Sequence, residues 1–223
     1  MTGLEFIRIM ITFVTQLKSL MKYIFLFFIS MAVFVSCTKK KTVESVNTNN
    51  SKDSLTYQPK VPGSKWTYQR SLNGTIHSTY NTTRLSYDTV INSHTYQVFD
   101  AETEGYQYIR QDGDKYYLVL TAAANKTELM IIDASKNIND TWVGGVNGTD
   151  TYHYTLLDRI PVYTLDGFTF KNVLKIHSER KDANNNVTLA GDSYYAQGVG
   201  QILSTGSIGP VAVEIKVITV DLK

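Results

Sequence analysis

Few residues of this chain have the types and spacing that chemistry requires. Metal centres take their ligands from closely spaced His, Cys, Asp or Glu side chains. The four histidines each stand alone, without a second ligand at such a spacing, and we interpret them as surface residues. They are His77, His94, His153 and His177. The sequence therefore predicts no metal site.

The acidic and glycine-rich segments also have simpler explanations than catalysis or cofactor binding. Asp112-Gly113-Asp114 lacks the further acidic ligands and distal Glu of a calcium loop, and favours a hairpin turn. The pair Glu102 and Glu104 could suggest glycosidase chemistry, but we interpret it as solvated charges at a strand edge. Gly198-Val199-Gly200 begins like a dinucleotide fingerprint, yet Leu203 replaces the third glycine. We predict no catalytic residues, no cofactor and no enzymatic activity.

The single cysteine, Cys37, excludes an internal disulfide and stands at an unusual place. Lys22 precedes an apolar run from Tyr23 to Val35, which has the length of a signal-peptide core. The sequence Phe34-Val35-Ser36-Cys37 resembles the lipobox of bacterial lipoproteins, although that family prefers Leu, Val or Ile where Phe34 stands. The resemblance implies recognition of Phe34, Val35 and Ser36 by signal peptidase II, cleavage before Cys37, and acylation of Cys37 with palmitate-type chains.

A transmembrane anchor with an incidental cysteine is the alternative interpretation of this segment. Residues 4–20 are also rather apolar, but Arg8, Gln16, Lys18 and Lys22 interrupt the stretch. We therefore expect Met21 to be the true start and residues 1–20 to be an upstream extension, with a signal peptide ending at residue 36. Whether Met1 or Met21 starts the chain stays open.

Residues 37–56 have the polar, aromatic-poor composition of a disordered tether between the lipidated Cys37 and the domain. Thr38 stands where Asp would retain an enterobacterial lipoprotein in the inner membrane. By that resemblance, we expect a lipid-anchored envelope protein of the outer membrane that faces the periplasm or the cell surface.

Residues 57–223 predict one all-β domain. The sequence is rich in Tyr, Thr, Asn and Gly, which favour strands and turns. Asn73-Gly74 and Asp166-Gly167 are typical two-residue hairpin loops. Near Val217 the alternating apolar residues shift from odd-numbered to even-numbered positions, which predicts a β-bulge there. We expect about nine to eleven antiparallel strands in a single meander, strongly curved into a half-barrel or barrel-like sheet.

Two further classes of protein are disfavoured. A net charge of +2 does not give the basic face of a nucleic-acid-binding protein, so no nucleic-acid partner is expected. A transmembrane barrel would share the alternation of apolar residues. However, it would not normally carry a lipidated cysteine and a polar tether.

Tyrosine is the most suggestive residue type, with 15 copies in the chain. Tyrosines could line a groove for a glycan or an apolar ligand, but they are equally the half-buried residues of ordinary sheets. The ligand-binding residues therefore stay unknown from the sequence. The candidates are Tyr106, Tyr108, Tyr116, Tyr117, Tyr152, Tyr154, Tyr194 and Tyr195.

Two short elements carry a family resemblance over residues 60–220. They are Gly63-x-x-Trp66-x-Tyr68 and Tyr194-Tyr195-Ala196-x-Gly198-Val199-Gly200. They resemble uncharacterised Gram-negative lipoproteins whose sheets are similar to the half-open barrel of LolA/LolB-type lipoprotein carriers and receptors. The resemblance implies a curved sheet that shelters acyl chains, and it brings no catalytic residues. The long helices that plug the carriers' concavity are not evident in this sequence.

Together these observations favour a non-catalytic envelope lipoprotein, anchored to the membrane by its N-terminal lipid. It would hold an apolar ligand, such as a lipid, or a partner protein on a curved sheet. The alternative is an assembly module that offers an exposed strand edge, for which the segment VAVEIKVITV at 211–220 is the candidate. An envelope hydrolase, built from carboxylates or histidines that converge in space, is a third and less supported possibility.

Overall fold

The computed structural model describes residues 56–120 and 126–223, which form twelve β-strands. One short 3-10 helix, η2 (Glu102–Glu104), connects the third and fourth strands. Within this described part, no helix is long and apolar enough to cross a membrane. The strands are β1 (Lys65–Leu72), β2 (Thr75–Ile91), β3 (His94–Asp100), β4 (Tyr106–Asp112), β5 (Lys115–Leu120), β6 (Thr127–Asp133), β7 (Thr141–Asn147), β8 (Asp150–Leu165), β9 (Phe168–Lys181), β10 (Val187–Ala196), β11 (Gly200–Ile208) and β12 (Val211–Asp221).

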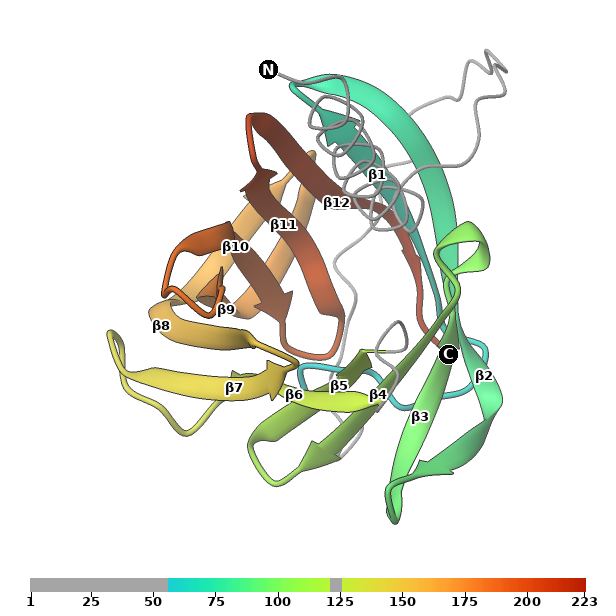
Figure 1. Ribbon diagram of the computed structural model, residues 1–223. Coiled ribbons are helices and arrows are strands. Elements are labelled where there is room, and N and C mark those ends of the chain that lie inside the picture. Colours follow the sequence, from blue (N-terminus) through green and yellow to red (C-terminus); the bar gives the residue numbers. More distant parts are fainter. Residues whose placement is uncertain (1–55, 121–125) are drawn as a thin grey trace, which may run out of the picture. The chain divides into compact units, whose positions relative to one another are not determined.

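All twelve strands belong to one antiparallel sheet that curls into a nearly closed barrel (Figure 1). Strands that follow each other in the chain pair with each other, except β6 and β7, and β1 also pairs with β12. The hydrogen-bonded order therefore runs from β6 back to β1, on to β12 and down to β7. The predicted all-β antiparallel meander is confirmed, with twelve strands. The predicted edge segment is wrong: β12 lies in the middle of the sheet, paired with β1 on one side and β11 on the other.

The hairpins follow from local sequence. Asn73 and Gly74 both take positive φ, as do Asp166 and Gly167, so each pair forms the tight turn that the sequence predicted. The bulge near Val217 is also confirmed: Thr67 pairs with Thr219 and Tyr68 with Val217, which leaves Ile218 as the extra residue.

Strand alternation gives the sheet an inner and an outer face. Tyr116, Trp142 and Leu174 come from β5, β7 and β9, yet they pack in one buried cluster, so their face points inward. The other face of β7 carries Val143 and Val146, which are more than half exposed. The register then assigns each strand's residues to one of the two faces.

The first described residues cover one end of the barrel, which we call the closed end. The backbone N–H of Tyr57 donates to the Tyr116 hydroxyl at 2.9 Å, and the N–H of Gly198 donates to the Thr56 carbonyl at 2.7 Å. Nearby, the Trp66 indole donates to the Val199 carbonyl at 2.8 Å. These bonds join the chain entry, β1, β5 and the β10–β11 turn at this end of the barrel.

The edge strands β6 and β7 meet at a seam that side chains bridge. The Trp142 indole donates to the Met130 carbonyl at 2.9 Å. A β carbon at Gly144 would lie 2.8 Å from that same carbonyl, and one at Gly145 would lie 2.8 Å from the Glu128 carbonyl. The backbones therefore approach more closely than any residue with a side chain would allow.

Candidate functional site: the inner patch of the barrel

The residues of the predicted lipobox, Phe34, Val35, Ser36 and Cys37, lie outside the described residues. The same holds for the predicted signal peptide and all of the tether up to residue 55. The site described below comes from the domain alone.

Inward side chains are not equally covered along the barrel. Toward the closed end, Leu156, Leu174, Ile176, Ile202 and Val217 are at most 1% exposed. Beside these residues and toward the other end, which we call the open end, a group of uncharged inward residues keeps partial solvent contact. We call this set the inner patch: Tyr68, Ser178, Gly191, Ser193, Tyr195, Ser204, Gly206 and Ile215.

The register makes the inner patch continuous across β9 to β12. Ser178 pairs with Gly191, which pairs with Gly206. One step deeper, Ser193 pairs with Ser204, which pairs with Ile215, and the two serine hydroxyls lie 3.3 Å apart. Small hydroxyl-bearing and glycine positions therefore lie side by side on a face where a filled barrel would carry large apolar residues.

The Gly191–Gly206 pair shows how tightly the sheet curves at this point. A β carbon at Gly206 would lie 2.6 Å from the Ala190 carbonyl and 3.1 Å from the Gly191 Cα. A β carbon at Gly191 would collide with the Thr205 carbonyl. Both positions thus require glycine, and no side chain covers the inner face of β10 and β11 where these two residues pair.

Tyrosines border the inner patch and are deeply embedded in protein. Desolvation by burial raises the pKa of Tyr195 to about 12 and that of Tyr80 to about 12, in the second case against the lowering effect of the Arg70 charge. Burial, followed by the neighbouring Tyr80 and Tyr195, raises the pKa of Tyr68 even further. Tyr68 stacks on Tyr80 with ring centroids 5.6 Å apart, and its hydroxyl donates to the Gln201 carbonyl at 2.9 Å.

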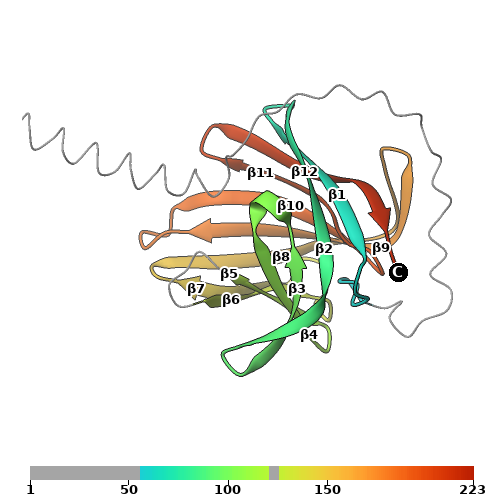
Figure 2. The same cartoon turned by 90° about the vertical axis from the view of Figure 1, so that its right-hand side faces the viewer.

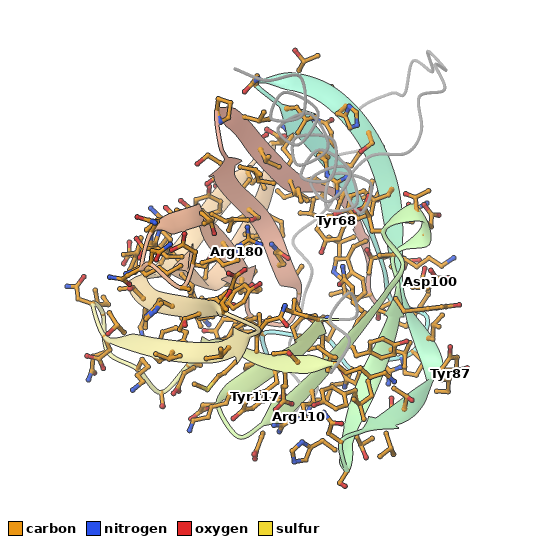
Figure 3. The ribbon with its side chains drawn as sticks, viewed as in Figure 1. Tyr68, Tyr87, Asp100, Arg110, Tyr117 and Arg180 are labelled. Carbon is orange, nitrogen blue, oxygen red and sulfur yellow. The ribbon has the colours of Figure 1, made fainter. Side chains whose placement is uncertain are left out.

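Tyr68 and Tyr195 combine this desolvation with side chains that are not fully covered. Both rings therefore lie among other residues of the sheet and keep part of their surface in contact with solvent. Figure 3 shows the contrast: Tyr68 lies beside β1 within the curve of the sheet, whereas Tyr87 projects from the outside of β2.

The raised pKa values predict a late phase in alkaline titration. These tyrosines stay protonated in the folded protein above pH 10, where they ionise in the unfolded chain. Their contribution to stability is therefore complete below pH 10 and is lost as the pH rises through about 12. Tyrosinate absorbance should show a slow final fraction that appears together with unfolding, and Tyr195→Phe should reduce that fraction. A titration completed in one fast phase would contradict this.

A buried ion pair borders the inner patch, and no spacing in the sequence predicted it. Arg70 is 3% exposed and binds the carboxylate of Glu104 through two nitrogens, at 2.7 and 2.9 Å. Its guanidinium also lies 5.4 Å from the centre of the Tyr80 ring. The interpretation of Glu102 and Glu104 as charges on a strand edge is wrong, because both belong to η2. Glu102 accepts hydrogen bonds from Asn81, and Glu104 neutralises Arg70.

The four histidines lie at the surface or are half-buried, which fits the predicted surface positions. His177 also contacts acidic residues that could not be identified from their spacing in the sequence. His77 and His94 are exposed, and His153 and His177 are half-buried on the outer face. The His177 ring lies 2.7 Å from Asp192, a residue of the adjacent strand, and 3.6 Å from Glu179. Lys175 binds the same Asp192 at 2.9 Å. Burial would raise the pKa of Asp192, but the hydrogen bonds from His177 and Lys175 hold it below its ordinary value.

The eight candidate tyrosines do not converge on one groove. Tyr116 and Tyr154 belong to the inner core, and Tyr152 and Tyr195 face inward nearer the open end. Tyr194 lies on the outer face and stacks on Tyr163. The remaining three lie elsewhere. Tyr106 is 50% exposed, and Tyr108 packs against the small cluster of Ile91, Tyr96 and Val119. The Arg110 guanidinium lies over the Tyr117 ring, 3.8 Å from its centre (Figure 3).

The Arg110 cluster is a second polar assembly on the outer face. Arg110 binds Glu128 through two nitrogens at 2.5 and 2.9 Å, and the Tyr96 hydroxyl donates to the same carboxylate. Burial would raise the pKa of Glu128, but the bonds from Arg110 and Tyr96 lower it on balance. Arg110 and Glu128 bind each other, so this cluster ties β4 to β6 across β5.

The inner patch itself contains no charged side chain. Its members are hydroxyls, aromatic rings, glycines and one aliphatic side chain. The charged residues in the same inward rows are paired, Arg70 with Glu104 and Arg180 with Asp150. Across the described ranges, no group of three His, Cys, Asp or Glu side chains is arranged to hold a metal ion. One sequence signal could have revealed the patch: Gly191-x-Ser193-x-Tyr195 and Ser204-x-Gly206 place small polar residues on a face that alternation assigns to the core.

Comparison with known proteins finds solved structures that are similar to this chain. No protein-family model matches the sequence, and no curated protein matches it. A Bacteroides fragilis protein, described as exported and as having a YmcC-like fold, superposes with a TM-score of 0.47 at 10% identity, over 73% of this chain and 97% of its own. A Parabacteroides distasonis protein, described as a lipoprotein, superposes with a TM-score of 0.43 at 13% identity, over 76% of this chain and all of its own.

Proposed function

We propose that this chain is a non-catalytic, lipid-anchored protein of the cell envelope whose barrel binds an apolar or amphiphilic ligand at the inner patch. The observation that carries the proposal is the partial exposure of an inward face that a tightly filled barrel would bury. The ligand's apolar part would contact Ile215 and the rings of Tyr68 and Tyr195. Its polar groups would meet the hydroxyls of Ser193 and Ser204.

The anchoring part of the proposal is supported by the sequence. A positive residue, an apolar run and Ser36-Cys37 stand in the order that lipoprotein processing requires. Attachment of several acyl chains to one cysteine gives stable membrane anchoring, whereas a single chain binds only marginally. Radiolabelled palmitate should therefore enter the chain, and Cys37→Ser should abolish its incorporation.

Binding through a free strand edge is less well supported. The edge strands β6 and β7 face each other across the seam, where Trp142 and the two glycines bring them into close contact. A partner strand would have to displace that contact before it could pair.

Native mass spectrometry of the full chain, purified in mild detergent from an envelope-containing host, tests ligand binding. We expect an added mass that is lost on denaturation. Ser204→Trp should reduce the bound fraction at least tenfold, because the indole would fill the inner patch. The matched control is Thr205→Trp, the next residue of β11, which alternation places on the outer face.

The control separates occupancy from folding. If Ser204→Trp and Thr205→Trp retain the ligand equally, the inner patch is not the binding site. If the wild-type chain carries no added mass and takes up none from mixed lipid micelles, the proposed binding function is wrong.

A further inference from the structure

We infer that the tips of the β1–β2 and β11–β12 hairpins form a lipid-contacting surface at the open end of the barrel. Together they make what we call the apolar tip, residues 71–76 and 207–212. It exposes Ile76 and Ile208, which are 62% and 40% accessible, and the β11–β12 turn adds Gly209 and Pro210. The inference concerns a surface outside the inner patch, and it rests on the proposed function in that the lipid anchor brings the domain to the membrane.

The apolar tip contains no charged residue. The segment from Ser71 to Ile76 and the longer one from Leu203 to Val213 both lack Asp, Glu, Lys and Arg, although 19% of the chain is charged. Exposed hairpin ends are normally polar or charged, because uncharged apolar edges promote association. Two neighbouring uncharged tips therefore point to an apolar partner.

The two hairpins are joined into one rigid unit. β1 pairs with β12 up to Leu72 and Val213. Beyond the paired residues, the Asn73 N–H donates to the Ala212 carbonyl at 2.9 Å, and the Ala212 N–H donates to the Asn73 side-chain oxygen at 2.9 Å. Figure 2 shows the two hairpins ending near each other at the top of the molecule. The exposed aliphatic residues are thus presented by a fixed scaffold.

The apolar tip is continuous with the inner patch. On β12 the inward residues from the tip downward are Val213, Ile215 and Val217, and their exposure falls from partial to none. An acyl chain that left a bilayer at the tip would find an aliphatic row along β12 that leads to the rings of Tyr68 and Tyr195.

A lipid surface fits the apolar tip better than a protein does. A stable protein interface buries roughly 1,200–2,000 Å² with matching shapes. The two hairpin ends contain twelve residues in all, fewer than the roughly 20–30 that such an interface takes from each partner. A bilayer requires no shape complementarity. Weak insertion would also suffice, because the anchor keeps the tip at a high local concentration near the membrane.

The chain is long enough for the lipid anchor at Cys37 and the apolar tip to contact the same membrane. Residues 38–55 can span up to about 60 Å when extended. β12 runs from the open end toward the closed end, and its 11 residues extend over about 36 Å. The chain between Cys37 and the closed end is therefore long enough for the open end to reach the bilayer that holds the anchor.

Depth-dependent fluorescence quenching tests the inference on the lipidated full chain. Ile208→Cys, labelled with an environment-sensitive dye, is reconstituted in phosphatidylcholine vesicles that contain lipids brominated on the acyl chain. The matched control is Val90→Cys, an aliphatic residue 68% exposed beside the β2–β3 turn, at the opposite end of the barrel. We expect the label at position 208 to lose at least half of its fluorescence and the label at position 90 to lose less than a tenth. Ile76→Asp, introduced beside the label, should halve the quenching at position 208.

Ligand uptake is measured on the same samples, so that failure of the apolar-tip inference can be distinguished from failure of the proposed ligand binding. Equal quenching at positions 208 and 90, whether strong or weak, overturns the inference about the apolar tip. Quenching at position 208 without any ligand uptake overturns the proposed function and leaves the surface assignment standing.

Discussion

Replacing Trp66 with alanine is expected to lower the free energy of unfolding by about 4 kcal/mol, within the range for truncating a buried tryptophan. Trp66 is 2% exposed and packs on Phe99 with ring centroids 6.0 Å apart. Its indole also donates to the Val199 carbonyl, which lies in the turn between β10 and β11. One side chain therefore joins β1, β3 and a turn more than 130 residues away, and the substitution removes both the packing and the hydrogen bond.

Two further variants separate these contributions in urea denaturation. Trp66→Phe keeps much of the ring volume but leaves the buried Val199 carbonyl without its donor, so we expect a loss of about 1–3 kcal/mol. Tyr87→Ala removes an aromatic ring that is 53% exposed and should change stability by less than about 0.5 kcal/mol. A Trp66→Ala protein as stable as Tyr87→Ala would show that the closed end does not depend on this contact.

The sequence predicted those features of the fold that depend on local chemistry. Asn-Gly and Asp-Gly pairs adopt the positive φ values that hairpin turns need, and the change of parity near Val217 marks an extra residue in the strand. The count of strands was harder to predict. β2, β8 and β9 have 17, 16 and 14 residues, longer than ordinary strands, and they continue through irregular pairing rather than ending.

The features that depend on strand order could not be predicted. The pairing of β1 with β12 joins the two ends of the domain and makes β12 a central strand, so its alternating apolar pattern reflects burial within the sheet. The Arg70–Glu104 pair joins β1 to η2 across 34 positions of the chain. The His177–Asp192 contact joins β9 to β10 across 15 positions through strand register. No spacing rule within a single segment would have linked them.

The exposure of the inner patch also could not be predicted from the sequence. Alternation predicts which residues of β10 and β11 face inward, but whether an inward serine is buried depends on what lies across the barrel. On β9, the neighbour of β10, Leu174 and Ile176 are fully covered, whereas Ser178, the next inward residue of the same strand, keeps partial exposure. Sequence alternation therefore identifies a face, and only the closed sheet shows where that face is left uncovered.

The seam between β6 and β7 is the second place where a single substitution should have a large effect. In Gly144→Val, the β carbon would collide with the Tyr154 ring and lie 2.8 Å from the Met130 carbonyl, the same oxygen that accepts the Trp142 indole proton. The backbone of β6 cannot yield without disturbing its pairing with β5, in which Tyr117 is opposite Met130. We expect the free energy of unfolding to fall by about 3 kcal/mol, typical of overpacking at a tight site.

The position next to Gly144 provides the matched control. Val143 is 54% exposed on the outer face, and Val143→Ala should change stability by less than about 0.5 kcal/mol. Hydrogen exchange adds a readout that is specific to the seam, because separation of β6 from β7 should speed amide exchange in both strands while β1 and β12, at the centre of the sheet, stay protected. If Gly144→Val unfolds at the same urea concentration as Val143→Ala, with unchanged exchange in β6 and β7, then close contact at the seam does not hold the barrel closed. If exchange rises only at the seam, the two edge strands can separate while the rest of the sheet remains folded.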